Sequence, residues 1–128
     1  VCGDALCSFN PIYGQGMTTA ASEAALLDDC LADGPEGIAA RFFRRASRLL
    51  DSPWSIAAGS DLAYPEVEGK RSPAMGLVGK YLDRLLMAAR EDTDLNVAFQ
   101  KVTNLIEPPA SLFRPGIVLR VLAGGRRR

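Results

Sequence analysis

The sequence predicts a mainly α-helical fold, and three observations support this prediction. Apolar residues recur at helical spacing in several stretches, proline and glycine stand between those stretches, and only residues 1–4 resemble a strand. The 128 residues fit one small domain or part of a larger one. With 48% apolar and 23% charged residues, the chain is expected to be globular rather than disordered.

The N-terminal segment predicts a strand end, a loop and a helix. Residues 1–4 read as a strand that ends at Gly3-Asp4, and residues 8–16 read as a loop because Asn-Pro and two glycines are turn signals. A helix is predicted over residues 17–31, where small and apolar residues recur every three to four positions. These are Met17, Ala20, Ala21, Ala24, Leu27 and Leu31. Asp28 and Asp29 lie near its end, where the helix macrodipole disfavours acidic residues.

Three to four further helices are predicted downstream, with prolines at their ends. Pro35 suits the first turn of a helix over residues 35–50, and a short helical stretch is expected over residues 54–58, after Pro53. Residues 59–73 contain several breakers and are expected to be irregular. The remaining predicted helices cover residues 74–90, 93–105 and 115–122.

Charge is balanced overall but unevenly distributed. Lys+Arg and Asp+Glu number 15 each, yet residues 1–37 contain six acidic residues and no Lys or Arg. The rest is net basic and ends in three arginines, which raises the question of nucleic-acid binding. The basic residues have no interleaved aromatic residues and form no binding motif, so we expect a solvated face and no nucleic-acid partner.

Several kinds of site are disfavoured by composition. The chain has no His, which excludes His-containing catalytic triads and the commonest metal ligand. Its three Cys lack metal-ligand spacing, so no metal site is predicted, and no residue is identified as a catalytic acid, base or nucleophile. Reduced thiols, the lack of a secretory pattern and the lack of an apolar run of about 20 residues favour a cytoplasmic protein.

The C-terminal segment, residues 112–128, mixes apolar and basic residues and allows two interpretations. It could contact a membrane surface as an interfacial segment. Alternatively, it forms a terminal helix packed on the rest of the protein. We favour the second interpretation because the apolar positions do not form a single stripe.

The most informative segment is residues 3–24, which contains the motif Gly3-Asp4, then Pro11, then Gly14-Gln15-Gly16-Met17 before a helix. Glycines allow a ligand to approach the backbone closely, and a helix start presents free N–H groups at the positive end of its dipole. This arrangement suits an anion or an electron-rich ring. Because no cations lie nearby in the sequence, backbone amides would have to bind it.

In order and spacing, these residues together with Glu23-Ala24 and Leu27 resemble the second flavin-binding motif of the FAD-dependent aromatic hydroxylases, the para-hydroxybenzoate-hydroxylase-like flavoprotein monooxygenases. The resemblance implies FAD as cofactor, NAD(P)H as reductant, and hydroxylation or epoxidation of a small organic substrate by oxygen. It also implies an intact parent of α/β type, with a Rossmann-like FAD-binding fold.

The resemblance implies a role for each motif residue. Asp4 would accept a hydrogen bond from a ribityl hydroxyl, and Gly3 would let the chain turn. Pro11 would lie beside the isoalloxazine ring. The amides around Gly14, Gln15, Gly16 and Met17 would face the ring edge where negative charge develops on reduction.

Departures from the family pattern keep alternatives open. Many members have His, Asn and Asp where this chain has Cys7, Thr18 and Glu23. Flavin-dependent prenyl reductases and halogenases carry similar runs, so a prenyl-type reductase is one alternative function. A non-catalytic helical interaction module that keeps the cofactor turn is another.

The predicted organisation is an FAD-contacting segment over residues 1–33 and a helical region over residues 34–128, together forming one continuous domain. The family's first motif, which cradles the FAD pyrophosphate, is absent. We therefore expect this chain to be the C-terminal part of a larger protein. It would need the missing N-terminal FAD-binding region and would bind FAD weakly or not at all when alone.

Overall fold

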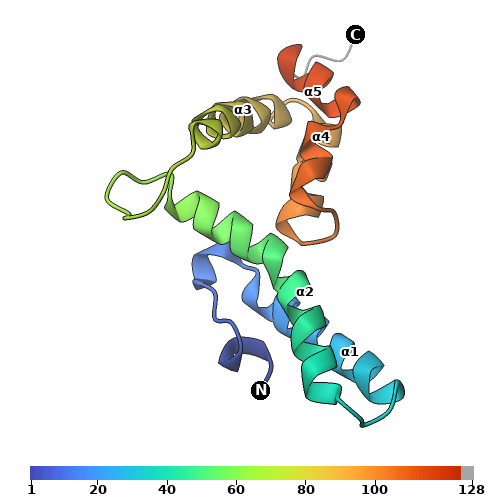
Figure 1. Cartoon of the computed structure of the whole chain (residues 1–128). Helices are drawn as coiled ribbons and strands as arrows, with labels where there is room; N and C mark the ends of the chain where they lie inside the picture. Colours follow the sequence, from blue (N-terminus) through green and yellow to red (C-terminus); the bar gives the residue numbers. More distant parts are fainter. Residues whose placement is uncertain (125–128) are drawn as a thin grey trace. The chain divides into compact units, whose positions relative to one another are not determined.

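The structure, a computed structural model, describes residues 1–124 and is all-α over that range, with no strand. Five α-helices are joined by turns and three short 3-10 helices (Figure 1). The α-helices are α1 (Gly16–Ala32), α2 (Ile38–Asp61), α3 (Pro73–Ala89), α4 (Thr93–Thr103) and α5 (Pro115–Leu122). The 3-10 helices are η1 (Gly3–Ala5), η2 (Pro11–Tyr13) and η3 (Pro109–Phe113).

The chain divides into two compact units, the first from Val1 to Ala58 and the second from Gly59 onward. The predicted division between residues 33 and 34 falls in the turn between α1 and α2, inside the first unit.

The mainly α prediction is confirmed, but the predicted strand end is wrong. Val1 and Cys2 belong to no regular element, and the chain turns at once into η1. Gly3 adopts φ +63°, and its carbonyl accepts hydrogen bonds from the amides of Leu6 (2.8 Å) and Cys7 (3.0 Å). A strand needs a partner for its backbone groups, and none is present in residues 1–124, so these groups are satisfied locally instead.

Most helix predictions are accurate to one or two residues at each end, with α2 as the exception. The sequence predicts a helix over 35–50 and a separate stretch over 54–58, whereas the structure has one helix that continues through Pro53 to Asp61. Proline removes one backbone hydrogen bond but does not end a helix whose neighbouring turns remain packed. Both Pro53 and Ala57 are buried, and their packing outweighs the local preference for a break.

The first unit is built on a helical hairpin. Cys30 of α1 packs with Phe42 and Ala46 of α2 in a buried cluster, which Leu6, Leu26, Leu27 and Ile38 flank. The face that α1 buries is not the stripe that the periodicity indicates. Met17, Ala21, Ala24 and Leu31 of that stripe are exposed, whereas Thr19, Glu23 and Cys30 are buried. Of the stripe, Leu27 flanks the cluster with α2, and Ala20 lies by the turn at Gly3, where an added Cβ would be 3.5 Å from the Cβ of Ala20.

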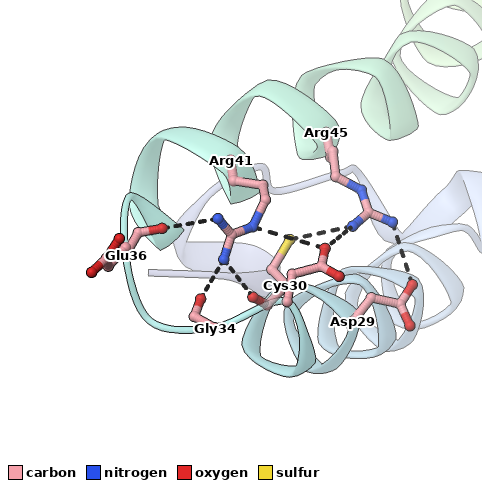
Figure 2. A network of polar contacts seen from close by, with 7 residues as sticks. Asp29, Cys30, Gly34, Glu36, Arg41 and Arg45 are labelled. Carbon is pink, nitrogen blue, oxygen red and sulfur yellow. Dashed lines mark hydrogen bonds and ion pairs between the residues drawn. The ribbon is translucent and has the colours of Figure 1, made fainter.

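Two arginines of α2 make polar contacts with the end of α1 (Figure 2). Arg41 donates to the backbone carbonyls of Cys30 (2.8 Å), Gly34 and Glu36 (2.9 Å). These are carbonyl groups at and after the helix end, where intrahelical donors run out.

Arg45 explains why acidic residues stand at the unfavourable end of α1. Its guanidinium lies 3.4 Å from the carboxylate of Asp29 and 3.8 Å from that of Asp33, and it donates to the thiol of Cys30 at 3.6 Å (Figure 2). These ion pairs offset the repulsion between the acids and the negative end of the helix dipole.

The second unit packs α3, α4, η3 and α5 against one another. Its buried apolar side chains come from all four elements and include Leu85, Ala88, Leu95, Val102, Leu112 and Val121. Tyr81 stacks on Phe113 with ring centroids 4.9 Å apart and donates its hydroxyl to the carbonyl of Leu112 at 2.7 Å.

Candidate functional site

The predicted flavin-contacting residues lie on η1, η2 and the first turn of α1. In the structure, Asp4 lies beside the start of α1: a Cβ added at Gly16 would lie 3.9 Å from Oδ1 of Asp4. Asp4 is exposed, and η1 packs along α1. An accessible carboxylate and the first turn of a helix thus share one surface, although twelve residues separate them in sequence.

The start of α1 is not capped by the residue in the N-cap position. Gln15 holds that position, and its side chain makes no capping hydrogen bond. The first intrahelical bond runs from the amide of Thr19 to the carbonyl of Gln15 at 2.9 Å. The amides that precede Thr19 in the first turn are the donors that a helix leaves without an intrahelical partner.

The loop before α1 is shaped by η2. Asn10 caps this short helix by accepting from the amide of Ile12 at 3.1 Å, and the amide of Gly14 donates to the carbonyl of Pro11 at 3.0 Å. Gly14 is left-handed at φ +66°, a conformation that glycine adopts without strain. A Cβ there would meet no atom of the described residues within 4 Å, so the loop is open at this point.

Two large apolar side chains flank the helix start. Ile12 is 80% exposed and Met17 is 87% exposed. Apolar groups beside free amide donors suit a flat, partly polar ligand better than a small inorganic anion.

Cys7 stands where many members of the resembled family have His, and the pKa of its thiol is raised. Burial is the main cause that raises the pKa of Cys7, and the nearby carboxylates of Glu23 and Asp4 raise it further. A thiol with a raised pKa is a poor nucleophile near neutral pH, so a redox or nucleophilic role for Cys7 is disfavoured.

The sequence interpretation missed the position of Glu23. Glu23 is fully buried, and its Oε2 accepts a hydrogen bond from the amide of Gly3 at 2.5 Å. The periodicity gave no signal for this burial, because the predicted stripe contains Ala24 and not Glu23, and Ala24 is exposed in the structure.

Other parts of residues 1–124 offer weaker candidate sites. No group of His, Cys, Asp or Glu there could hold a metal ion. A cavity of about 270 Å³ in the second unit is lined by Lys101, Glu107 and Arg114 among others, but Glu107 already pairs with Lys101 (3.3 Å) and Arg114 (2.9 Å). Its cations are therefore engaged within the protein.

The C-terminal segment is packed into the second unit as far as it is described. Val121 of α5 is buried, and Arg120 pairs with Asp92 and Asp94 of the α4 region. The three terminal arginines, which raised the question of nucleic acid, lie outside the described residues. Of the helices in residues 1–124, none combines the length and apolar character needed to cross a membrane.

Comparisons with known proteins do not identify a ligand for this surface. No protein-family model matches the chain, and no curated protein matches it with significant sequence similarity. The site is therefore defined by the turn at Gly3 and Asp4, the open loop at Gly14 and the start of α1.

Proposed function

We propose that this chain supplies the ring-side FAD contacts of a flavin-dependent monooxygenase or hydroxylase that uses NAD(P)H and oxygen on a small organic substrate. The observation that carries the proposal is the placement of the Asp4 carboxylate beside Gly16, at the start of α1. The resemblance of residues 3–27 to a flavin-binding motif assigns ligand contacts to both of these positions.

The arrangement fits the chemistry of a flavin. The carboxylate of Asp4 can accept a hydrogen bond from a ribityl hydroxyl, and the amides of Gly16 and Met17 can donate to the polar edge of the ring. Fixed dipoles aimed at that edge stabilise the negative charge that accumulates there on reduction. Exposed Ile12 and Met17 offer apolar contact area near the same amides.

The residues present fit one part of FAD. Backbone amides and one carboxylate suit the ribityl chain and the ring, whereas residues 1–37 contain no cation to face the pyrophosphate. When bound, FAD would supply the redox chemistry, and this chain would bind and orient it. The pyrophosphate would be bound by an N-terminal region outside this sequence, and α2 and the second unit would form helical cover for the parent protein.

The loop before α1 is open at Gly14 but not along its whole length. A non-catalytic interaction module that only retains the old turn is expected to have the Gly14–Gly16 loop occluded. Gly14 is exposed, and a Cβ added there would meet no described atom within 4 Å, whereas Gln15 is only 2% exposed. The accessible part of the site is therefore Gly14 with the exposed side chains of Asp4 and Met17, and the interaction module stays an alternative. A prenyl-type reductase uses the same flavin contacts and differs only in the reaction.

The flavin contact is tested by titrating the isotope-labelled 128-residue chain with FAD and following backbone amides by NMR. Of the two outcomes expected for the chain alone, weak binding or none, the proposed ring-side contacts require weak binding, with a dissociation constant above the micromolar range. The shifts should be concentrated at Gly14, Gly16 and Met17. Asp4→Ala should reduce these shifts, whereas Asp51→Ala, an exposed change in the same unit, should not. Absence of shifts at millimolar FAD contradicts the proposal, and sub-micromolar binding refutes the expected need for a second FAD-binding region.

The reaction class is tested on the intact protein. A monooxygenase consumes oxygen in proportion to product, in the presence of NAD(P)H and substrate. A reductase forms its product without oxygen, so product formation under anaerobic conditions favours that alternative.

A further inference from the structure

Glu23 is an acidic residue buried in an unusual place. It lies on the inward face of α1 and is completely inaccessible to solvent. Its Oε2 accepts a hydrogen bond from the backbone amide of Gly3 at 2.5 Å. Its Oε1 is also buried and has no hydrogen-bond partner among the described residues.

This burial is unfavourable for stability by itself. A carboxyl group loses its hydration when buried, and one hydrogen bond with a second oxygen left unpaired does not replace that hydration. An apolar side chain of similar length would avoid this penalty but would leave the part-buried amide of Gly3 without its acceptor. The specific contribution of the acid at this position is therefore the hydrogen bond that places Gly3.

The hydrogen bond from Gly3 to Glu23 fixes the turn that carries Asp4. The Gly3 carbonyl accepts hydrogen bonds from the amides of Leu6 and Cys7, so the turn is closed on itself. The turn is joined to α1 by the hydrogen bond from Gly3 to Glu23, across 20 positions of sequence, and by packing. A Cβ added at Gly3 would lie 3.5 Å from the Cβ of Ala20, and Leu6 packs against the cluster that contains Cys30 of α1. Asp4, the next residue, lies beside Gly16, about two turns of helix before Glu23.

We propose that Glu23 is a positioning residue for the flavin site, which holds Asp4 in register with the first turn of α1 so that both contact one ligand. The proposal rests on the proposed flavin function and adds a residue that does not itself touch the cofactor. Without the acceptor at position 23, the turn at Gly3 loses its hydrogen bond to α1 and keeps only its packing contacts, so ordering Asp4 costs part of the binding free energy.

Two near-isosteric variants separate positioning from packing. Glu23→Gln retains a carbonyl oxygen that can accept from Gly3, whereas Glu23→Met keeps the length and helix preference but has no such acceptor. Glu36→Gln and Glu36→Met are matched controls, because Glu36 is exposed, lies in the same unit and contacts Arg41 only through its backbone carbonyl.

Binding is measured by NMR on the 128-residue chain, from FAD-dependent shifts of the Gly14, Gly16 and Met17 amides. We expect Glu23→Met to weaken binding about tenfold, the effect of losing one well-placed hydrogen bond, and Glu23→Gln to stay within about threefold of the unsubstituted chain. The Gly3 amide proton provides a second readout: its downfield shift should be kept in Glu23→Gln and lost in Glu23→Met. The Glu36 variants should change neither quantity.

The outcomes distinguish this proposal from the one on which it rests. If the unsubstituted chain shows no FAD-dependent shifts, the flavin function is overturned, whatever happens to the Gly3 amide. If it binds FAD and folded Glu23→Met binds equally well, the positioning role is overturned and the flavin function stands. If Glu23→Met does not fold, Glu23→Ala tests the same loss in a residue of high helix propensity, with the same expected weakening.

Discussion

The two units use arginine in opposite ways. In the first unit, Arg41 donates to backbone carbonyls at the end of α1, and Arg45 pairs with carboxylates that are 68% and 61% exposed. In the second unit, Arg120 binds Asp92, whose side chain is 1% exposed, through contacts of 2.6 and 2.9 Å.

The difference lies in what remains when the arginine contact is lost. Of the carbonyls that Arg41 contacts, those of Gly34 and Glu36 belong to half-buried or exposed residues and can bind water instead, whereas Cys30 is buried, so the first unit has a partial alternative. Asp92 is buried and also caps α4 by accepting from the amides of Asp94 (3.0 Å) and Leu95 (3.2 Å). We infer that the second unit depends on one carboxylate, whereas the first distributes its polar contacts over several weaker groups.

The largest expected effect is that of Asp92→Ala, which removes the cap of α4 and the buried partner of Arg120 together. We expect a loss of about 2–4 kcal/mol from the stability of the second unit. Urea unfolding, with hydrogen exchange measured separately on each unit, checks it. Asp92→Asn retains a capping oxygen and should lose less; a loss below about 1 kcal/mol for Asp92→Ala contradicts the dependence on one carboxylate.

Arg41→Ala is expected to have a smaller effect, confined to the first unit. It removes three hydrogen bonds to carbonyls that water can partly replace, so a loss of about 1–3 kcal/mol is expected. Arg41→Lys should recover only part of it, because an ammonium lacks the planar fork of the guanidinium. Arg44→Lys, on the exposed face of α2, is the control and should leave the stability unchanged. Equal losses of stability in Arg41→Lys and Arg44→Lys would contradict the contact geometry.

Low pH provides a further test of the second unit, because two of its carboxylates, Asp92 and Glu107, have lowered pKa values. Burial pushes the pKa of Asp92 upward, but the hydrogen bonds from Arg120 and from the amides of Leu95 and Asp94 outweigh it and hold the pKa below its usual 3.8. The hydrogen bond from Lys101 is the main cause that lowers the pKa of Glu107, with Arg114 adding to it.

Because both folded-state pKa values lie below the unfolded ones, the unfolded chain takes up protons first as the pH falls. The stability contributed by these groups is present above pH about 4.5 and is lost as the pH falls through the folded-state values. Hydrogen exchange of α4 and α5 between pH 6 and pH 2 should reveal this loss. Asp92→Asn should flatten the profile, and an unchanged profile in that variant contradicts the assignment to Asp92.

The smallest predicted effect concerns the thiols of the first unit. Burial, Glu23 and Asp4 raise the pKa of Cys7, whereas Cys2 is exposed. At pH 8, iodoacetamide should alkylate Cys7 at least roughly threefold more slowly than Cys2, since the thiolate is the reactive form. Glu23→Gln removes one of the two carboxylates that raise the pKa of Cys7 and should therefore accelerate its alkylation. The rate is measured by mass spectrometry of the modified peptides, and Cys2 in the same sample is the internal control.

Much of the helical fold could be predicted from the sequence because helix ends are local. Pro73 and Pro115 begin helices at or within one residue of the predicted starts, and periodicity locates α1, α3 and α4 within one or two residues. The continuous α2 could not be predicted in this way, because burial of Pro53 is a tertiary property that outweighs its local preference. The predicted strand end was also wrong for a tertiary reason. A strand needs a partner strand, and residues 1–124 contain none.

The candidate site was predictable only in part. Glycine spacing placed the open loop and the helix start, and the structure brings Asp4 to the same surface. The hydrogen bond from Gly3 to Glu23 joins residues 20 positions apart and has no local signature in the sequence. The arginine contacts that explain Asp29 and Asp33 likewise depend on the turn between α1 and α2.

The span of the Asp92–Arg120 pair has a consequence for synthesis. The two residues lie 28 positions apart, so Asp92 is translated well before the guanidinium that neutralises it. In that interval α4 has its cap but not its counter-charge, and the second unit can complete its core only after α5 has left the ribosome. A chain stalled before residue 120 therefore presents an incompletely folded second unit to chaperones and proteases.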